Sequence, residues 1–220
     1  MNLSLSNILI GAIMLLTIMP VHEYAHAWAA DKLGDGSARL SGRMTLNPFA
    51  HLDLVGSISF LLVGIGWGKP VPVYMRNLNH PKRDMMLVAL AGPASNVVLT
   101  ILLMIVYKVL SAIVVAAGIQ NYIVNILLWV ILMIAQTSAR WAVFNMLPVP
   151  PLDGSRLLEY LLPWQAYAKI EQYQQIIYIV MLVLLVTGVL SVPLSFLTNL
   201  LLKLVSLITL PVDLLLGVLF

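Results

Sequence analysis

The sequence predicts an α-helical polytopic membrane protein with about five transmembrane helices, a re-entrant segment and a small membrane-associated β-hairpin or strand region. Two properties of the composition support this fold class. Hydrophobic residues make up 61% of the 220 residues and charged residues only 10%, whereas soluble domains have about 45–50% and about 25%. A chain of this length leaves roughly a third of its surface uncovered, so this much apolar side chain requires lipid around it.

Five apolar stretches are long enough to cross a bilayer, which takes about 20 residues. They are expected at about 4–32, 85–110, 122–147, 174–190 and 194–220. A sixth stretch, 54–67, is shorter and rich in glycine, so we expect a re-entrant or irregular segment whose backbone is covered by protein or water. The first stretch is not expected to be a removable signal peptide, because residues 1–20 contain no Lys or Arg.

Residues 37–47 alternate between polar and apolar side chains, which is the two-residue period of a β-strand. Residues 71–75 are expected to form a second strand, which Pro70 and Pro72 confine to a sheet edge. Two interpretations of this region remain open. It is either an amphipathic hairpin at the end of the bundle or a sheet edge that pairs with an extended peptide.

Charge and cysteine usage exclude several classes of function. The chain has no cysteine, which excludes disulfides, thiol catalysis, Cys-type zinc sites and iron–sulfur clusters. Its net charge of +3 is too small and too scattered to indicate a nucleic-acid partner. Any metal ion must therefore be held by histidine and carboxylate side chains.

His22, Glu23 and His26 form an HExxH motif at the inner end of the first apolar stretch. Residues four apart lie on one face of a helix, so both imidazoles can reach one metal ion while the glutamate faces a metal-bound water. The motif alone is a weak signal, but these polar groups are costly in an apolar helix unless they are paired or bind a metal. The alternative is a structural cluster or an interfacial cap.

A catalytic zinc site normally has three protein ligands and one open position. The best candidate for the third ligand is Asp153, near the end of the proline-rich stretch 145–154. Its three prolines prevent a continuing helix, so the span must end close to this site. Asp153 could instead cap a helix that starts at Ser155, and the local sequence does not separate the two roles.

Two asparagines stand in apolar surroundings near these motifs. Asn96 ends the stretch 91–96, whose small residues allow helices to approach closely, and Asn145 opens the stretch 145–154. Each amide could donate to a substrate carbonyl or a developing oxyanion, or simply bond a neighbouring helix. The other two histidines, His51 and His80, are expected to have no role as ligands.

Five segments in this order resemble the site-2 protease family of intramembrane zinc metalloproteases: 22–26, 47–56, 66–73, 91–96 and 145–154. By this resemblance His22, His26 and Asp153 match the zinc ligands, Glu23 the catalytic glutamate, and Asn96 and Asn145 polar positions near the site. The chain looks like a compact prokaryotic-type member without a PDZ domain. The resemblance also implies a membrane-embedded strand region that receives the unwound substrate.

The resulting hypothesis is a metalloendopeptidase of regulated intramembrane proteolysis that hydrolyses peptide bonds within or near transmembrane segments. One Zn²⁺ per chain is expected to lower the pKa of its bound water, the nucleophile, towards about 7. Glu23 is expected to act first as general base and then as general acid. The expected partners are a transmembrane protein or peptide substrate and membrane lipid, and the oligomeric state is unknown.

Basic residues lie after the first span, before the second and between the third and fourth. Since Lys and Arg favour the cytoplasmic side, we expect a multi-pass protein of the cell membrane with its N-terminus outside and its active site towards the cytoplasm. Residues 1–220 are expected to form one membrane-embedded domain. Its motif-bearing core covers about 4–160 and its C-terminal helices about 174–220.

A competing hypothesis is a polytopic metal-ion transporter or a metal-sensing membrane protein, because intramembrane His and Asp also mark ion pathways. Glu23 distinguishes the two. Hydrolysis needs a base beside the first ligand that does not itself bind the metal, whereas transport has no need of one.

Overall fold

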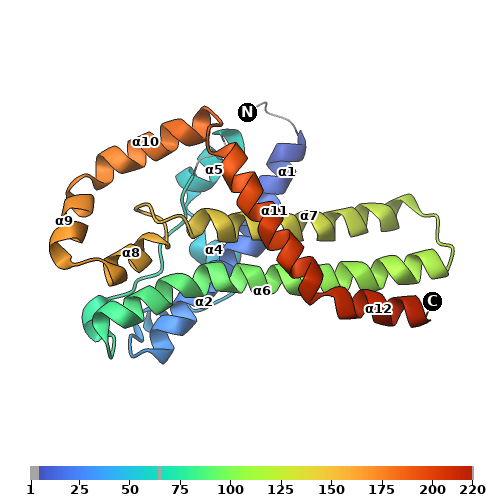
Figure 1. Ribbon diagram of the computed structural model, residues 1–220, viewed down its shortest axis with the longest axis horizontal. Coiled ribbons are helices and arrows are strands. Elements are labelled where there is room, and N and C mark those ends of the chain that lie inside the picture. Colours follow the sequence, from blue (N-terminus) through green and yellow to red (C-terminus); the bar gives the residue numbers. More distant parts are fainter. Residues whose placement is uncertain (1–4, 64–65, 220) are drawn as a thin grey trace.

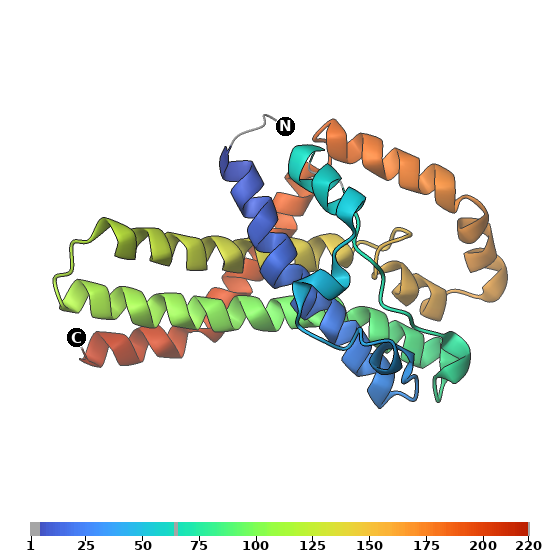
Figure 2. The same ribbon diagram turned by 180° about the vertical axis from the view of Figure 1, so that it is seen from behind.

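The protein is described by a computed structural model over residues 5–63 and 66–219, and helices make up most of this part of the chain. Two long helices, α6 (Pro81–Ala116) and α7 (Tyr122–Asn145), form an antiparallel hairpin (Figure 1). The first helical rod crosses one face of this hairpin, and α11 (Ser191–Ile208) crosses the other face (Figure 2). The hairpin is therefore the central layer of the fold.

The first helical rod consists of three pieces in continuous succession. They are α1 (Leu5–Ile13), the π-helical segment η1 (Met14–Ile18) and α2 (Met19–Lys32). Pro20 stands in the first turn of α2, directly after η1, and its missing N–H removes one helical hydrogen bond at this junction. The rod thus carries the HExxH motif on its second half, which packs against α6.

Shorter helices complete the fold. They are α3 (Ser37–Leu40), α4 (Pro48–His51), α5 (Leu54–Val63), the 3₁₀ turn η2 (Met75–Asn77), α8 (Ser155–Leu161), α9 (Trp164–Gln172), α10 (Gln174–Val186) and α12 (Leu210–Leu219). Figure 1 shows α8, α9 and α10 as an arc at one end of the molecule, while α12 runs beside the far half of α6.

Four helices of the described chain are long and apolar enough to cross a membrane: Ile8–Lys32, α6, α7 and α11. A fifth is present if α9 and α10, which meet at a bend of 62°, count as one span. The expectation of about five spans agrees with this range. Predicting one continuous span over 194–220 was wrong, because α11 ends at Ile208 and α12 follows as a separate helix. Pro211 has no N–H to continue the helical bonding there.

The predicted β-hairpin is absent from the described residues. They contain no strand, and their one isolated bridge joins Leu52 to Gly68. Where 37–47 was expected to be extended, the chain forms the short helix α3 and then turns at Gly42, whose φ of 70° favours glycine. The interpretation of this region as a sheet edge that pairs with a peptide is therefore incorrect.

The physical reason is the buried side chain of Asp35, which lies just before the predicted strand. Its carboxylate accepts hydrogen bonds from Ser37 N at 3.1 Å, Tyr74 N at 2.6 Å and Asn77 Nδ2 at 3.0 Å. Backbone groups of both predicted strands therefore bond to one carboxylate, which replaces the ladder that a hairpin would need.

The predicted re-entrant stretch 54–67 forms α5 and then returns along it. A side-chain carbon on Gly56 would lie 3.0 Å from Trp67 Cδ1 and closer still to the Trp67 backbone. One on Gly66 would collide with Gly56 and Phe60. The glycines thus permit two backbones to touch, which is the course that a re-entrant segment requires; residues 64–65 lie outside the described chain.

The site region is the crossing of α2, α6 and the end of α7. Ala29 and Ala30 of α2 are buried against Val88 of α6, and Ala135 and Ala139 of α7 are fully buried. Small residues let helices approach closely, which matters in lipid because packing rather than water exclusion holds helices together there. The polar groups of three helices are consequently brought within contact distance.

Candidate metal centre

The two histidines of the motif face the same side of α2. His22 Nε2 lies 3.0 Å from His26 Nε2, and the ring centroids are 4.6 Å apart. His22 is buried, and the His26 side chain is only 11% exposed. The four-residue spacing therefore places two imidazole nitrogens together inside the protein, as the sequence predicted.

Asp153 reaches these nitrogens from the loop that follows α7. Its Oδ2 lies 3.1 Å from His22 Nε2 and 3.4 Å from His26 Nε2. Gly154 is the N-cap residue of α8, and no side chain among the described residues makes a capping hydrogen bond to that helix. The structure thus places Asp153 against the histidines and not at the helix end, the alternative that the sequence left open.

The loop that carries Asp153 closes back on the end of α7. Gly154 N donates to the Asn145 carbonyl at 2.7 Å. A side-chain carbon on Gly154 would lie 2.6 Å from the Leu147 carbonyl oxygen, so only glycine fits this turn. The proline-rich stretch therefore forms a compact loop whose far end projects the carboxylate towards α2.

The spacing of the three donor atoms fits a tetrahedral metal site. Bonds of about 2.0–2.2 Å place the ligands of a tetrahedral zinc ion about 3.3–3.6 Å from one another. The separations here, 3.0, 3.1 and 3.4 Å, are close to that. Asp153 Oδ2 is buried and has no hydrogen-bond partner in the described part of the chain, which leaves its lone pairs free for a cation. His22, His26 and Asp153 together form a candidate metal centre.

Helix α6 contacts the opposite nitrogen of each ring. The Val88 carbonyl lies 2.8 Å from His26 Nδ1, and Asn96 Nδ2 lies 3.1 Å from His22 Nδ1. Gly92 lies between them on the same face, where a side-chain carbon would be 2.6 Å from His22 Cε1 and would collide with His26. The glycine provides the space that both rings occupy.

Glu23 is partly exposed beside the two histidines. Its carboxylate makes no hydrogen bond or ion pair with any residue that the structure describes. Since it is the residue next to His22, it lies near the donor cluster without belonging to it.

The two asparagines take different places. Asn96 is fully buried and its amide contacts His22, whereas Asn145 is 8% exposed and its Nδ2 donates to the Trp141 carbonyl at 3.0 Å. Both remaining histidines lie outside the cluster. His51 Nε2 contacts the Thr45 carbonyl at 2.8 Å, and His80 Nδ1 contacts the Asn79 carbonyl at 2.9 Å.

Sequence reasoning missed two groups around the centre. The Trp141 ring packs against His22 with a centroid distance of 6.2 Å, and its Nε1 is buried without a partner among the described residues. Helical spacing could have indicated Trp141, because it lies one turn before Asn145. The Val88 carbonyl has no signal in the sequence, since a backbone group can belong to any residue type.

Comparison with known proteins assigns the chain to a family. The model of peptidase family M50 matches residues 108–188. YwhC of Bacillus subtilis (strain 168), named as a candidate zinc metalloprotease, is 38% identical over 80% of this chain and 79% of its own length. The chain belongs to peptidase family M50. The resemblance to the site-2 protease family is thereby confirmed.

Two further relatives are the Rip2 proteins of Mycolicibacterium smegmatis and Mycobacterium tuberculosis, also named as candidate zinc metalloproteases. They are 31% and 30% identical over 78% and 66% of this chain, which spans 64% and 54% of their own lengths. No solved structure matches this M50 chain significantly. Its apolar helices and its family together make it a multi-pass membrane peptidase.

Proposed function

We propose that this M50 peptidase is an intramembrane zinc metalloprotease that hydrolyses peptide bonds within or near transmembrane segments of other membrane proteins. The observation that carries the proposal is the convergence of His22, His26 and Asp153. Glu23, which has no ion-pair partner among the described residues, is next to His22 in the chain. The names of the relatives favour zinc. When bound, zinc polarises the scissile carbonyl and makes water a stronger nucleophile at neutral pH.

The protein's own groups hold the ion and leave one position open. His22 and His26 would bind through Nε2 and Asp153 through Oδ2, which is a two-histidine, one-carboxylate set. The Nδ1 atoms are already engaged with α6, so the rings are oriented before any ion binds. One zinc ion per chain satisfies this set.

Glu23 is the proposed proton carrier. Its carboxylate takes a proton from water as the water oxygen bonds to the scissile carbonyl carbon, and it passes that proton to the amine nitrogen as the C–N bond breaks. The supporting observation is that Glu23 is partly exposed and unpaired among the described residues. A glutamate already held in an ion pair would have to break it to act.

Asn145 is the proposed group for binding the substrate carbonyl or the developing oxyanion. It stands where α7 ends, and the loop from Asn145 to Gly154 brings Asp153 back beside it. A substrate helix hides its carbonyls in its own hydrogen bonds, so it has to unwind before it can reach these groups.

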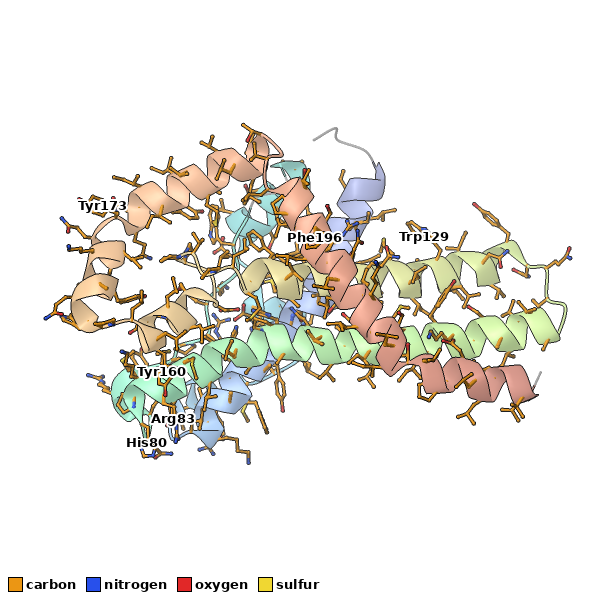
Figure 3. All side chains as sticks on the ribbon, viewed as in Figure 1. His80, Arg83, Trp129, Tyr160, Tyr173 and Phe196 are labelled. Carbon is orange, nitrogen blue, oxygen red and sulfur yellow. The ribbon has the colours of Figure 1, made fainter. Side chains whose placement is uncertain are left out.

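The proposed orientation has the N-terminus outside and the site towards the cytoplasm. Figure 3 shows His80, Arg83 and Tyr160 at one end of the molecule and Trp129 towards the other. Arg83 in the first turn of α6 and Tyr160 in α8 therefore share one end, and Lys82 Nζ donates to the Leu162 carbonyl at 3.2 Å across it. Basic residues gathered at one end are what the positive-inside rule expects of a cytoplasmic face. We treat 1–220 as one membrane-embedded domain.

The test uses the full chain purified in detergent, with metal analysis and a single-span model substrate. Glu23→Gln should retain about one zinc ion per chain and lose cleavage, because the amide cannot accept the proton. Glu171→Gln, which changes an acid in α9, is the matched control and should cleave like the wild type. Cleavage by Glu23→Gln at the wild-type rate, or wild-type protein without zinc, would refute the proposal.

A further inference from the structure

Three residues of α6 share one face and meet the two imidazoles. Val88, Gly92 and Asn96 are spaced by four, so they lie one above the other along the helix. The Val88 carbonyl contacts His26 Nδ1, the Asn96 amide contacts His22 Nδ1, and Gly92 makes room between them. Each ring therefore has its Nδ1 towards α6 and its Nε2 towards Asp153.

The chemistry of imidazole makes the partner of Nδ1 decisive. A neutral ring carries one hydrogen, and a nitrogen that binds a metal must be the one without it. A carbonyl can only accept, so Val88 keeps the hydrogen of His26 on Nδ1. The corresponding acceptor for His22 can only be the side-chain oxygen of Asn96, because its amide is the group in contact with that Nδ1.

Asn96 has that oxygen free. In the structure its Nδ2 faces His22 Nδ1, and its Oδ1 is buried without a partner among the described residues. A rotation of 180° about the last side-chain bond exchanges the two atoms. The same side chain can therefore donate to Nδ1 in one orientation and accept from it in the other, holding the ring in either tautomer.

We propose that Asn96 is a positioning residue, which keeps the hydrogen of His22 on Nδ1 and directs the Nε2 lone pair towards the metal position. This inference rests on the proposed function, since it takes His22 as a metal ligand. It replaces the sequence-based hypothesis that Asn96 donates to the substrate. The Asn96 amide lies behind the His22 ring as seen from Asp153, and its side chain is fully buried.

The backbone around Asn96 is held in place for this task. Its carbonyl oxygen accepts from Thr100 Oγ1 at 2.8 Å and from Ser138 Oγ of α7 at 2.9 Å. Thr100 Oγ1 also lies 3.3 Å from the Ala135 carbonyl. Two buried hydroxyls thus tie α6 to α7 at the residue that contacts His22, and this fixes the amide relative to the ring.

The experiment compares zinc affinity with turnover in full-length protein in detergent. The variants are Asn96→Leu, which removes the acceptor at similar size, and Asn96→Asp, which keeps an acceptor but cannot donate. Thr198→Val is the control, because it deletes a buried hydroxyl of α11 that bonds within its own helix. The zinc Kd is measured by competition with a chelator, and kcat and KM on a single-span substrate at saturating zinc.

We expect Asn96→Leu to weaken zinc binding by about 10- to 100-fold, the usual effect of losing the outer partner of a histidine ligand. Asn96→Asp should recover most of that affinity, and Thr198→Val should leave it unchanged. An unchanged zinc Kd in Asn96→Leu overturns the inference. So does an Asn96→Asp protein that binds zinc normally but has a much lower kcat, because that result assigns Asn96 to the substrate.

The same series separates failure of this inference from failure of the proposed function. His22→Ala removes the ligand itself and should lose zinc more completely than any Asn96 variant. If His22→Ala binds zinc like the wild type, the proposed metal centre is wrong. If Asn96→Leu does not fold, Asn96→Asp alone still decides between the two roles, since only a substrate donor requires the amide N–H.

Discussion

The two halves of α6 each place a polar side chain in apolar surroundings, and the two side chains meet different partners. In the first half, fully buried Asn96 contacts His22 of α2. In the second half, Lys108 Nζ donates to Thr209 Oγ1 at 2.8 Å and pairs with Asp213 of α12. A polar group is costly in lipid in both cases. The energetic cost of burying a polar side chain therefore does not reveal its role. The partner does: Asn96 contacts a histidine of the candidate metal centre, whereas Lys108 attaches α12 to α6.

The two halves of α6 also differ in how deeply their side chains are buried. Val88, Gly92 and Asn96 are buried between α2 and α7, whereas Val106, Leu110 and Ile113 are exposed on the protein surface, where lipid can cover them. Changes in the first half should therefore affect metal binding, while changes in the second half should affect only how firmly the C-terminal helices are attached.

The largest effect is expected from Gly92→Ala. The added methyl would lie 2.6 Å from His22 Cε1 and collide with His26, so both rings have to move. Zinc binding and cleavage should fall by more than the about 100-fold that the loss of an outer partner costs. Metal analysis and the cleavage assay measure this.

The matched control lies in α12. Gly217 is also helical, but a side-chain carbon there would meet no described atom within 4 Å. Gly217→Ala should leave zinc content unchanged and raise stability by about 0.5–1 kcal/mol, because alanine is the better helix former. Equal behaviour of the two glycine variants would show that the first half of α6 does not shape the metal centre.

The next effect is expected from Asp153→Ala. It removes one of the three donors and leaves two imidazoles without their carboxylate partner. Zinc affinity should fall further than in Asn96→Leu, because a ligand is lost and not its support. Chelator competition gives both values, and the reverse order would argue for a different third ligand.

A moderate effect on stability alone is expected from Lys108→Met. It leaves the Asp213 carboxylate without its partner and should lower the free energy of unfolding by about 1–3 kcal/mol. The double variant Lys108→Met/Asp213→Leu should recover much of the loss, because no unpaired charge remains. Thermal unfolding in detergent measures this, and a loss of zinc affinity in either variant would break the comparison between the two halves.

The smallest effect concerns Asp35, outside both halves. Burial raises the pKa of its carboxyl, but hydrogen bonds from Ser37, Asn77 and Tyr74 outweigh it and hold that pKa below the ordinary value. Its stabilisation is therefore fully present above the unfolded pKa of about 3.9 and is lost as the pH falls through the lower folded value. Unfolding temperatures should decline less steeply below pH 4 in Asp35→Asn than in the wild type. Identical slopes would contradict this.

Much of the site could be predicted, because it depends on residue spacing within one helix and on the number and type of ligands that a metal needs. The four-residue spacing of His22 and His26 places them on one helix face. Asp153 followed from the absence of cysteine and the need for a third ligand. The contact between Asn96 and His22 could not be predicted, because the two residues lie 74 apart in the sequence and only the packing of α2 on α6 brings them together.

The predicted hairpin failed for a related reason. The polar–apolar alternation over 37–47 predicts a strand, but it does not reveal that the buried carboxylate of Asp35 accepts hydrogen bonds from backbone N–H groups of both predicted strands. The positions of most membrane spans were predicted correctly, because the length of an apolar stretch can be determined from each segment alone. The exception was the division between α11 and α12. The apolar stretch is continuous there, but Pro211 lacks the N–H that an unbroken helix would need.

The centre draws its histidines from the first helix and its aspartate from a loop far along the chain, with a third helix holding the rings. A nascent chain whose synthesis has not passed Asp153 carries only two of the three donors. If these three side chains hold the metal, as proposed, the centre stays incomplete until Asp153 has been synthesised and its loop has folded against the first helical rod. Ribosome-arrested chains that end before Asp153 should accordingly fail to retain zinc.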